Sequence, residues 1–202
     1  MAWRDEGDGP LPVLVIPFPA PVRMVSSAPL GGGLGLRRWA LIAQVQGSYT
    51  RRDPDVHLRQ IAAGIDLSGP GVGMLTAADL DADARGGNDS GVEVLATVGL
   101  GHPIRAAAPQ GADEERTVAG TINLVAWVPV RLSDAALVNA LATATEAKSQ
   151  ALADLGLDAT GTATDAVCIA CPPAGVPEPF GGPRSPWGAR LARAVHAAVL
   201  GR

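Results

Sequence analysis

The sequence predicts a single α+β domain with a mixed, largely antiparallel sheet and about three helices. Three observations favour this class. Most β-prone segments follow one another directly along the chain, and three helical segments are inserted between them or follow them. The 202 residues include 25 glycines and 17 prolines, which indicates many turns in a compact chain. Hydrophobic residues make up 47% and charged residues 18%, so the chain is not intrinsically disordered.

The first half of the chain is predicted to consist mostly of strands. Residues 1–20 are rich in Gly and Pro and are expected to form a loose arm that ends in an edge strand, so the main domain is expected over residues 21–202. Asp53 and Pro54 suit the N-cap and first position of a helix that ends near Gly64. The other expected elements are strands over 21–28, 39–49, 71–78 and 91–100 and turns over 31–35 and 81–90.

The second half contains the longest predicted helix. Ser133 is a favourable N-cap and Gly156 is a favourable residue after the last helical position, so a long helix is expected between them. Ser185 followed by Pro186 predicts the start of a final helix. The remaining expected elements are a surface loop over 106–116, strands over 117–128 and 161–170, and a loop over 172–183.

Charge and cysteine content exclude several classes of function. The formal charge is −4 with no run of like charges, so no nucleic-acid partner is expected. No segment approaches the ~20 apolar residues that a spanning helix requires, and the acidic N-terminus differs from a secretory signal, so we expect a cytoplasmic protein with no membrane partner. Cys168 and Cys171 are too few for a disulfide framework, and strand geometry predicts two inert buried thiols on opposite faces. No metal site is expected.

Common nucleotide and hydrolase signatures are absent from the sequence. There is no G-x-x-x-x-G-K phosphate loop, no G-x-S-x-G nucleophile elbow and no H-E-x-x-H pair. The glycine cluster over 31–35 lacks the Lys and the Ser or Thr of a phosphate loop, and the Gly-rich segment over 69–73 contains a proline. Nucleotide-dependent transfer is therefore disfavoured.

Lys148 is the only lysine among the 16 basic residues, and it lies on the long predicted helix. A period of 3.6 residues places it within the apolar stripe of that helix, which is formed by Leu137, Leu141, Ala144, Leu152 and Leu155. Because an unpaired ammonium group is costly to bury, Lys148 is expected to line a cleft or to pair with a carboxylate. Two structural alternatives are a lysine that reaches solvent at the helix edge and a buried ion pair without catalytic use.

Three polar groups of residues flank or share this helix. Thr121 and Asn123 alternate with apolar residues on a predicted strand, and Thr162, Thr164 and Asp165 precede another strand. A crossover through the helix would bring the two strands together beside it. Thr145 shares the face of Lys148, where its hydroxyl could lie beside the amine or bond back to its own helix.

These segments, taken in order, resemble the adenosylcobinamide amidohydrolase family. The resemblance rests on Gly120-Thr-Ile-Asn123, on Thr143-Ala-Thr-Glu-Ala-Lys148 and on Gly161-Thr-Ala-Thr-Asp-Ala166, with support from 26–33, 73–78 and 180–188. It covers about residues 25–199 and leaves residues 1–20 unassigned. The resemblance implies hydrolysis of the amide that joins the aminopropanol arm to the corrin ring of adenosylcobinamide, which releases adenosylcobyric acid for cobalamin synthesis. It implies no cofactor beyond the cobalt of the corrinoid substrate.

Amide hydrolysis requires a nucleophile, donors for the oxyanion and an acid for the leaving amine. Lys148 or Asp165 is expected to serve as the base and proton donor. The expected nucleophile is a hydroxyl of Thr145, Thr162 or Thr164, unless water attacks directly. The remaining expected site residues are Asn123 and Thr121 as oxyanion or substrate donors, Glu146 as a motif residue that faces away from Lys148, and Gly32 and Gly33 as substrate contacts.

Two other functions fit the same sequence. One is a corrinoid carrier without catalysis, since such a protein also needs a wide, largely apolar pocket with a few amide-binding groups. The other is an amidase for a small acyl amide. Homo-oligomer formation is possible.

Overall fold

The computed structural model describes residues 1–7, 9–109 and 120–201. The three long helices that the sequence predicts are present, and one short helix is added. Ser133 and Ser185 cap two of them, because their side chains accept hydrogen bonds from the backbone N–H groups of Ala136 and Gly188. The helices are α1 (Pro54–Gly64), α2 (Leu80–Asp83), α3 (Asp134–Asp154) and α4 (Pro186–Leu200).

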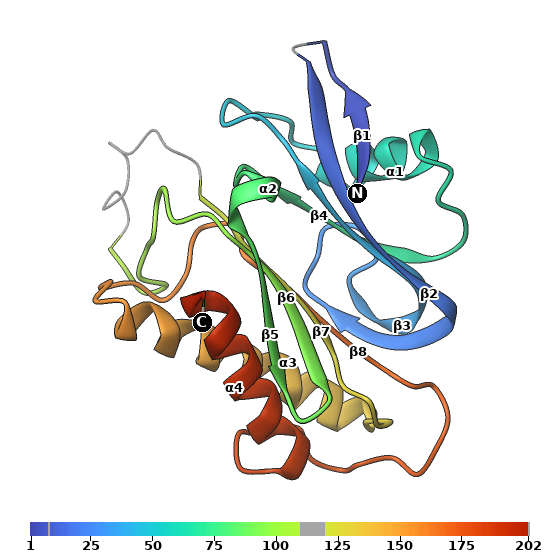
Figure 1. Cartoon of the computed structure of the whole chain (residues 1–202), viewed down its shortest axis with the longest axis vertical. Coiled ribbons are helices and arrows are strands. Elements are labelled where there is room, and N and C mark those ends of the chain that lie inside the picture. Colours follow the sequence, from blue (N-terminus) through green and yellow to red (C-terminus); the bar gives the residue numbers. More distant parts are fainter. Residues whose placement is uncertain (8, 110–119, 202) are drawn as a thin grey trace.

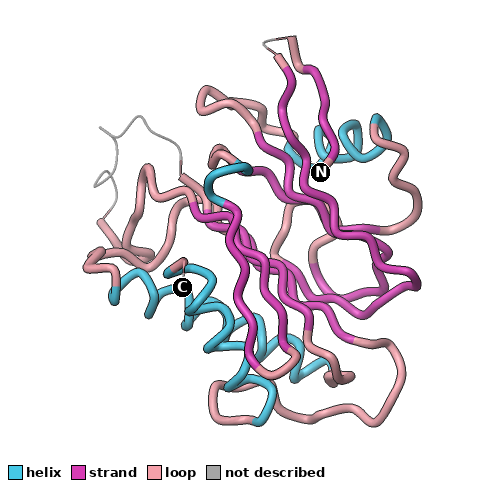
Figure 2. Tube along the Cα trace, in the orientation of Figure 1, coloured by secondary structure: helices cyan, strands magenta, loops and turns pink. Residues whose placement is uncertain are grey.

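The strands form one mixed sheet, in which most neighbouring pairs are antiparallel (Figures 1 and 2). The strand order is β4-β3-β2-β8-β7-β6-β5, and β1 pairs with the first part of β2. Within the described residues, the β3–β4 and β7–β8 pairs are parallel and the other strand pairs are antiparallel. The strands are β1 (Ala2–Asp5), β2 (Pro10–Ser26), β3 (Gly33–Gln44), β4 (Gly71–Thr76), β5 (Ala84–Asp89), β6 (Val92–Val98), β7 (Ile122–Trp127) and β8 (Ala166–Cys171).

The sheet curves back on itself, so that the fold has four layers. Helices α3 and α4 cover β6, β7 and β8 with one apolar cluster, and α1 covers β3 and the first part of β2 with another. A third apolar cluster lies between the two halves of the sheet, where β2, β3 and β4 face β7 and β8. Figure 1 shows α1 on one side of the strands and α3 and α4 on the other. This curvature brings the end of β4 close to the start of β7.

Residues 1–20 differ most from the sequence-based expectation. They are not a loose arm, because they contain β1 and most of β2, a strand of 17 residues that lies inside the sheet. The β2–β3 register shifts between Pro17 and Val22, and Pro19 and Pro21 lie within this break. A proline that lacks an N–H group is tolerated where the hydrogen-bond ladder is already interrupted. The proline content therefore marks a bend in a long strand.

Two further predictions require correction. Residues 81–90 are not a turn, since they contain the end of α2 and all of β5. The turn is limited to Ser90 and Gly91, which have φ values of 50° and 92° and join β5 to β6, as in a two-residue hairpin of type I′. The strand expected over 117–128 begins only at Ile122, and its residues 117–119 lie outside the described residues.

The cysteine prediction is confirmed. Both cysteines are free and fully buried. Cys168 lies in the cluster between the two halves of the sheet, and Cys171 lies in the cluster beneath α3 and α4, so they occupy opposite faces of β8. In the described parts of the chain, no helix is long and apolar enough to cross a membrane.

Candidate active site

Lys148 of α3 is buried, as its place in the apolar stripe predicts, and it pairs with Asp165. The side chains are 6% and 10% exposed, and Lys148 Nζ donates to Asp165 Oδ2. Asp165 is the residue immediately before β8, so the pair joins the helix to the sheet at the point where β7 and β8 begin. A buried ammonium group is tolerated here because it has a carboxylate partner.

Asp165 accepts four hydrogen bonds. Its Oδ1 accepts from the backbone N–H of Ile122 at 2.8 Å and from Thr162 Oγ1 at 2.5 Å. Its Oδ2 accepts from the backbone N–H of Thr162 at 3.0 Å and from Lys148. With two bonds to each oxygen, the carboxylate has no unused lone pair to take a proton from a substrate. It instead fixes the 161–165 turn to the start of β7 and to α3.

Gly161 lies directly beside this pair. A Cβ atom built on Gly161 would lie 2.5 Å from Lys148 Nζ and closer still to Asp165 Oδ2. Its backbone also bonds to Ile104, whose N–H donates to the Gly161 carbonyl at 2.8 Å. The glycine that begins the polar segment therefore leaves the space that the ion pair fills.

A cavity with a volume of about 390 Å³ opens at the same end of β7 and β8. We call it the threonine cavity, because Thr121 and Thr164 line it and their hydroxyl groups are bonded to each other at 2.7 Å. Thr164 is exposed, whereas Thr121 is buried. The other lining residues are Pro29, Val45, Gln46, Gly47, Tyr49, Thr50, Arg51, Pro54, Met74, Leu75, Thr76, Ala77, Asn123 and Ala166.

Asn123 contributes a buried acceptor to the threonine cavity. Its side chain spans the curved sheet, and its Nδ2 donates to the Leu75 carbonyl of β4 at 2.8 Å. This bond assigns the opposite atom as Oδ1, which is buried without a hydrogen-bond partner, in a residue that is 0% exposed. An unsatisfied buried acceptor at a cavity wall is suited to bind an N–H group of a ligand.

The structure thus brings together six of the residues expected in the site. Lys148 and Asp165 form the ion pair, Thr162 bonds to it, and Thr121, Asn123 and Thr164 lie at the threonine cavity next to it. The crossover through α3, which joins the parallel strands β7 and β8, produces this arrangement.

The other expected site residues lie elsewhere. Thr145 is exposed and its hydroxyl donates to the Leu141 carbonyl of its own helix at 3.0 Å, which was the structural alternative for this residue. Glu146 is also exposed on α3. Gly32 and Gly33 lie where the chain turns from β2 into β3. None of these four is among the residues that line the threonine cavity.

Several wall residues were not predicted as site residues. Tyr49 and Arg51 come from the loop before α1, and Met74 to Ala77 come from the end of β4. Residues 73–78 belong to the resemblance to the family, and this resemblance was the only sequence feature that could have placed Met74 to Ala77 in the site. Nothing local marked Tyr49, because its place in the wall depends on the curvature of the sheet. Among the described residues, no group of three or more His, Cys, Asp or Glu side chains is arranged to hold a metal ion.

Two known proteins that share one name are similar to this chain. A protein named adenosylcobinamide amidohydrolase from Methanosarcina mazei is 29% identical over 84% of each chain. A protein of the same name from Halobacterium salinarum is 43% identical over 54% of this chain, and the match spans about half (48%) of that relative. Among solved structures, a beta-aminopeptidase from Burkholderia sp. covers 98% of this chain and 80% of its own, with a TM-score of 0.48 and 15% identity.

A family model gives the widest sequence match. The model described as adenosylcobinamide amidohydrolase matches residues 4–201, and the match begins inside the segment that the sequence alone left unassigned. It contains all the residues that form the ion pair and the polar part of the threonine cavity. The chain therefore belongs to the adenosylcobinamide amidohydrolase family.

Proposed function

We propose that the chain hydrolyses the amide between the aminopropanol arm and the corrin ring of adenosylcobinamide, and that the reaction takes place at the threonine cavity. One observation carries this proposal: the polar residues at the start of β7 and those just before β8 meet at one cavity. Thr121 and Asn123 come from β7, Thr164 precedes β8, and the Lys148–Asp165 pair fixes them together. The names of the two relatives and of the family support the substrate.

Each polar group of the cavity has a separate role in this proposal. The unpartnered Oδ1 of Asn123 accepts the N–H of the scissile amide, which orients the carbonyl carbon. The hydroxyl of Thr164 is the nucleophile, because Thr164 is exposed at the cavity and its hydroxyl is bonded to Thr121 and not to Asp165. Thr121 holds that hydroxyl in place at 2.7 Å. Attack by Thr164 gives an ester, which water then hydrolyses.

Lys148 and Asp165 act by position in this arrangement. All four acceptor positions of the Asp165 carboxylate are occupied, and Lys148 does not line the cavity. Their pair holds the 161–165 turn, and therefore Thr164, against β7. In this proposal the two residues therefore have a structural role, in place of the role as base and proton donor that was expected from the sequence.

The volume of the cavity limits how the substrate binds. Cavities of 300–1,000 Å³ hold drug-sized ligands, and a corrinoid is much larger than these. A cavity of about 390 Å³ therefore admits the arm and the scissile amide, while the corrin ring stays outside. We also propose that the reaction takes place in the cytoplasm.

The first experiment compares the parent protein with Lys148→Ala and Thr164→Ala variants. Each is incubated with adenosylcobinamide, release of aminopropanol and adenosylcobyric acid is followed by mass spectrometry, and folding is checked by thermal melting. We expect cleavage by the parent and little or none by folded Thr164→Ala, with activity retained in the matched Thr164→Ser variant. A parent that binds the corrinoid and leaves its amide intact would instead be a carrier. Full activity in the Thr164→Ala variant would show that Thr164 is not the nucleophile.

A further inference from the structure

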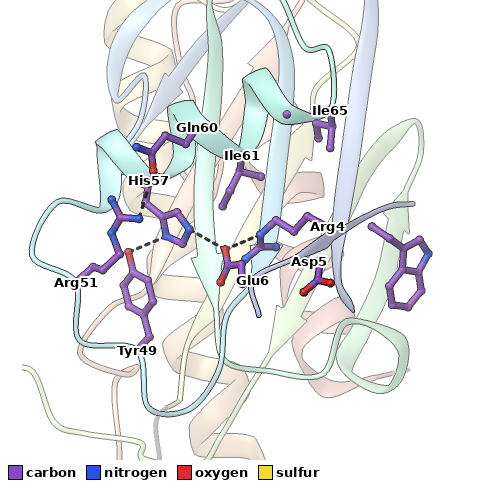
Figure 3. A pocket seen from close by; sticks show the side chains of 11 residues that line it. Arg4, Asp5, Glu6, Tyr49, Arg51, His57, Gln60, Ile61 and Ile65 are labelled. Carbon is purple, nitrogen blue, oxygen red and sulfur yellow. Dashed lines mark hydrogen bonds and ion pairs between the residues drawn. The ribbon is translucent and has the colours of Figure 1, made fainter. Parts of the chain in front are cut away.

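A second cavity, with a volume of about 660 Å³, lies on the other side of the loop that contains Tyr49 and Arg51. Figure 3 shows its side chains, which come from the β1 end of the chain, from this loop and from α1. We call it the histidine cavity, after His57 of α1. Tyr49 and Arg51 line both the histidine cavity and the threonine cavity. The two cavities therefore share a wall.

Three side chains form a hydrogen-bonded chain across the histidine cavity. His57 Nε2 lies 2.7 Å from Glu6 Oε1, and His57 Nδ1 lies 3.1 Å from the hydroxyl of Tyr49 (Figure 3). The rings of Tyr49 and His57 are stacked, with centroids 5.5 Å apart and planes 12° apart. Arg4 Nε also donates to Glu6, at 2.8 Å.

The ionisation state of Glu6 determines where the protons lie in the hydrogen bonds from Glu6 through His57 to Tyr49. Burial raises the pKa of Glu6, but hydrogen bonds from Arg4 and His57 outweigh it and hold the pKa below its ordinary value, so Glu6 is ionised. An ionised carboxylate only accepts, and His57 Nε2 therefore donates to it. In neutral His57 the other nitrogen, Nδ1, is then an acceptor for the phenol O–H of Tyr49. This is the order of a catalytic triad: an acid that orients a histidine, and a histidine that takes a proton from a hydroxyl group.

The threonine cavity needs such a group. Amide hydrolysis requires that a proton leave the nucleophile and that a proton reach the departing amine. Among the described residues that line this cavity, the ionisable ones are Tyr49 and Arg51. The Asp53 carboxylate raises the pKa of Arg51 further, so Arg51 keeps its proton. Tyr49 is the group of this wall that can exchange one.

We infer that Tyr49 is a catalytic residue of the amide hydrolysis and that His57 and Glu6 position it and exchange its proton. This inference rests on the proposed function. As Thr164 Oγ1 bonds to the amide carbon, its proton passes to the Tyr49 oxygen and the Tyr49 proton passes to His57 Nδ1. As the C–N bond breaks, Tyr49 gives a proton to the amine nitrogen and His57 Nδ1 returns a proton to Tyr49. Water then attacks the ester by the same exchange and restores the Thr164 hydroxyl.

The deciding variant is Tyr49→Phe, because it removes only the hydroxyl and keeps the ring stacked on His57. We expect kcat for adenosylcobinamide to fall by about 10²–10³, the usual contribution of a positioned acid–base group, with KM changed less than threefold. Val56→Ala is the matched control, since Val56 lies on α1 next to His57, is 38% exposed and lines neither cavity. Its kcat is expected to stay within about twofold of the parent value. Thermal melting of both variants checks the fold.

Chemical rescue separates proton exchange from structural support. His57→Ala removes the imidazole beside a cavity of about 660 Å³, which has room for added imidazole. We expect added imidazole to restore at least a tenth of the parent kcat in His57→Ala and to have no effect on Tyr49→Phe. Rescue of this kind is not expected if His57 only anchors the β1–β2 hairpin to α1.

The outcomes separate this inference from the proposed function. A parent protein that does not cleave adenosylcobinamide would refute the proposed function, and the inference with it. An active parent together with a Tyr49→Phe variant of unchanged kcat would overturn the inference alone. If added imidazole does not restore activity to a folded His57→Ala protein, proton exchange through His57 is excluded. Should His57→Ala not fold, the Tyr49→Phe result decides.

Discussion

Lys148 of α3 and Asp165 at the start of β8 form an ion pair that is at least nine-tenths buried on both sides. The carboxylate of this pair also accepts from the backbone of β7 and from Thr162. One side-chain contact therefore joins a helix, a turn and two strands at the edge of the threonine cavity. The stability of this end of the fold and the shape of the site depend on the same two residues.

Removal of the Lys148 ammonium group should lower the stability of the fold. Breaking a buried ion pair costs about 3–5 kcal/mol, and Asp165 keeps three other donors, so Lys148→Met is expected to lower the free energy of unfolding by about 3 kcal/mol. Urea unfolding of Lys148→Met, Asp165→Asn and the double variant measures the coupling. Asp55→Asn breaks the exposed pair with Arg59 and should cost less than about 0.5 kcal/mol. Equal costs for the two pairs would contradict a buried role for Lys148.

Gly161→Ala should disrupt the site without a change of charge. The added methyl group would press on Lys148 Nζ and Asp165 Oδ2, so the ion pair and its hydrogen bonds would have to shift. We expect a loss of at least about 1–3 kcal/mol in stability and a drop in kcat, seen by urea unfolding and by the cleavage assay. Gly86→Ala is the control, because a Cβ atom there has no neighbour within 4 Å. A stable and active Gly161→Ala protein would show that the ion pair tolerates displacement.

Asn123→Asp tests the buried amide. The substitution replaces the Nδ2 donor by an oxygen that faces the Leu75 carbonyl, in a residue that is 0% exposed. Two acceptors would then face each other, so we expect a stability loss of about 1–3 kcal/mol and a fall in kcat of about 10²-fold or more. Measurement of kcat and the urea midpoint at neutral pH checks this. Parent-like stability and catalysis in the aspartate variant would show that the hydrogen bond from Nδ2 to the Leu75 carbonyl does not hold this residue in place.

The two cysteines should be unreactive in the folded protein. Burial raises the pKa of the Cys168 thiol to about 12 from an ordinary value of 9.0, and burial also raises the pKa of Cys171. A thiol reagent at pH 8 should therefore label neither residue until denaturant is added, and should then label both. Rapid labelling in native buffer would show that β8 opens locally.

The same shifts predict a loss of stability in alkali. Between about pH 9 and pH 12 the unfolded thiols lose protons that the folded protein retains, so the unfolded state binds fewer protons and the free energy of unfolding falls as the pH rises. Below pH 9 this contribution is fully present. A variant with alanine at both cysteine positions should lose less stability over this range, as measured by urea unfolding at pH 7, 9 and 10.5. A slope equal to that of the parent would assign the loss to other groups.

The sequence was most informative where structure depends on local chemistry. The N-caps at Ser133 and Ser185 follow from neighbouring residues alone, and they were predicted correctly. On α3 the predicted burial of Leu137, Ala144 and Leu152 is also correct, whereas Leu155 of the predicted stripe lies after the helix and is 42% exposed. The burial of Lys148 followed from the same helical period. Its partner Asp165, 17 positions further on, was predicted only as a neighbour through the crossover between two strands.

The sequence was least informative where distant segments meet. The chain from Glu6 through His57 to Tyr49 links residues up to 51 positions apart and exists because β1 and β2 form a hairpin beside α1. That hairpin was hidden by prolines, which favour a loop prediction but here occupy a break in the strand ladder. The position of Leu75 beside Asn123 depends on sheet curvature, which no local pattern reports.

The central position of β2 has a consequence for biosynthesis. Its last residues, from Arg23 to Ser26, pair with Cys171 to Cys168, so the ribosome releases one partner about 140 residues before the other. Until then the nascent chain exposes an unpaired apolar edge, which invites association with other chains. Translation that stops before residue 166 would leave this edge open permanently. Premature termination before β8 is therefore expected to yield aggregated product rather than a shortened enzyme.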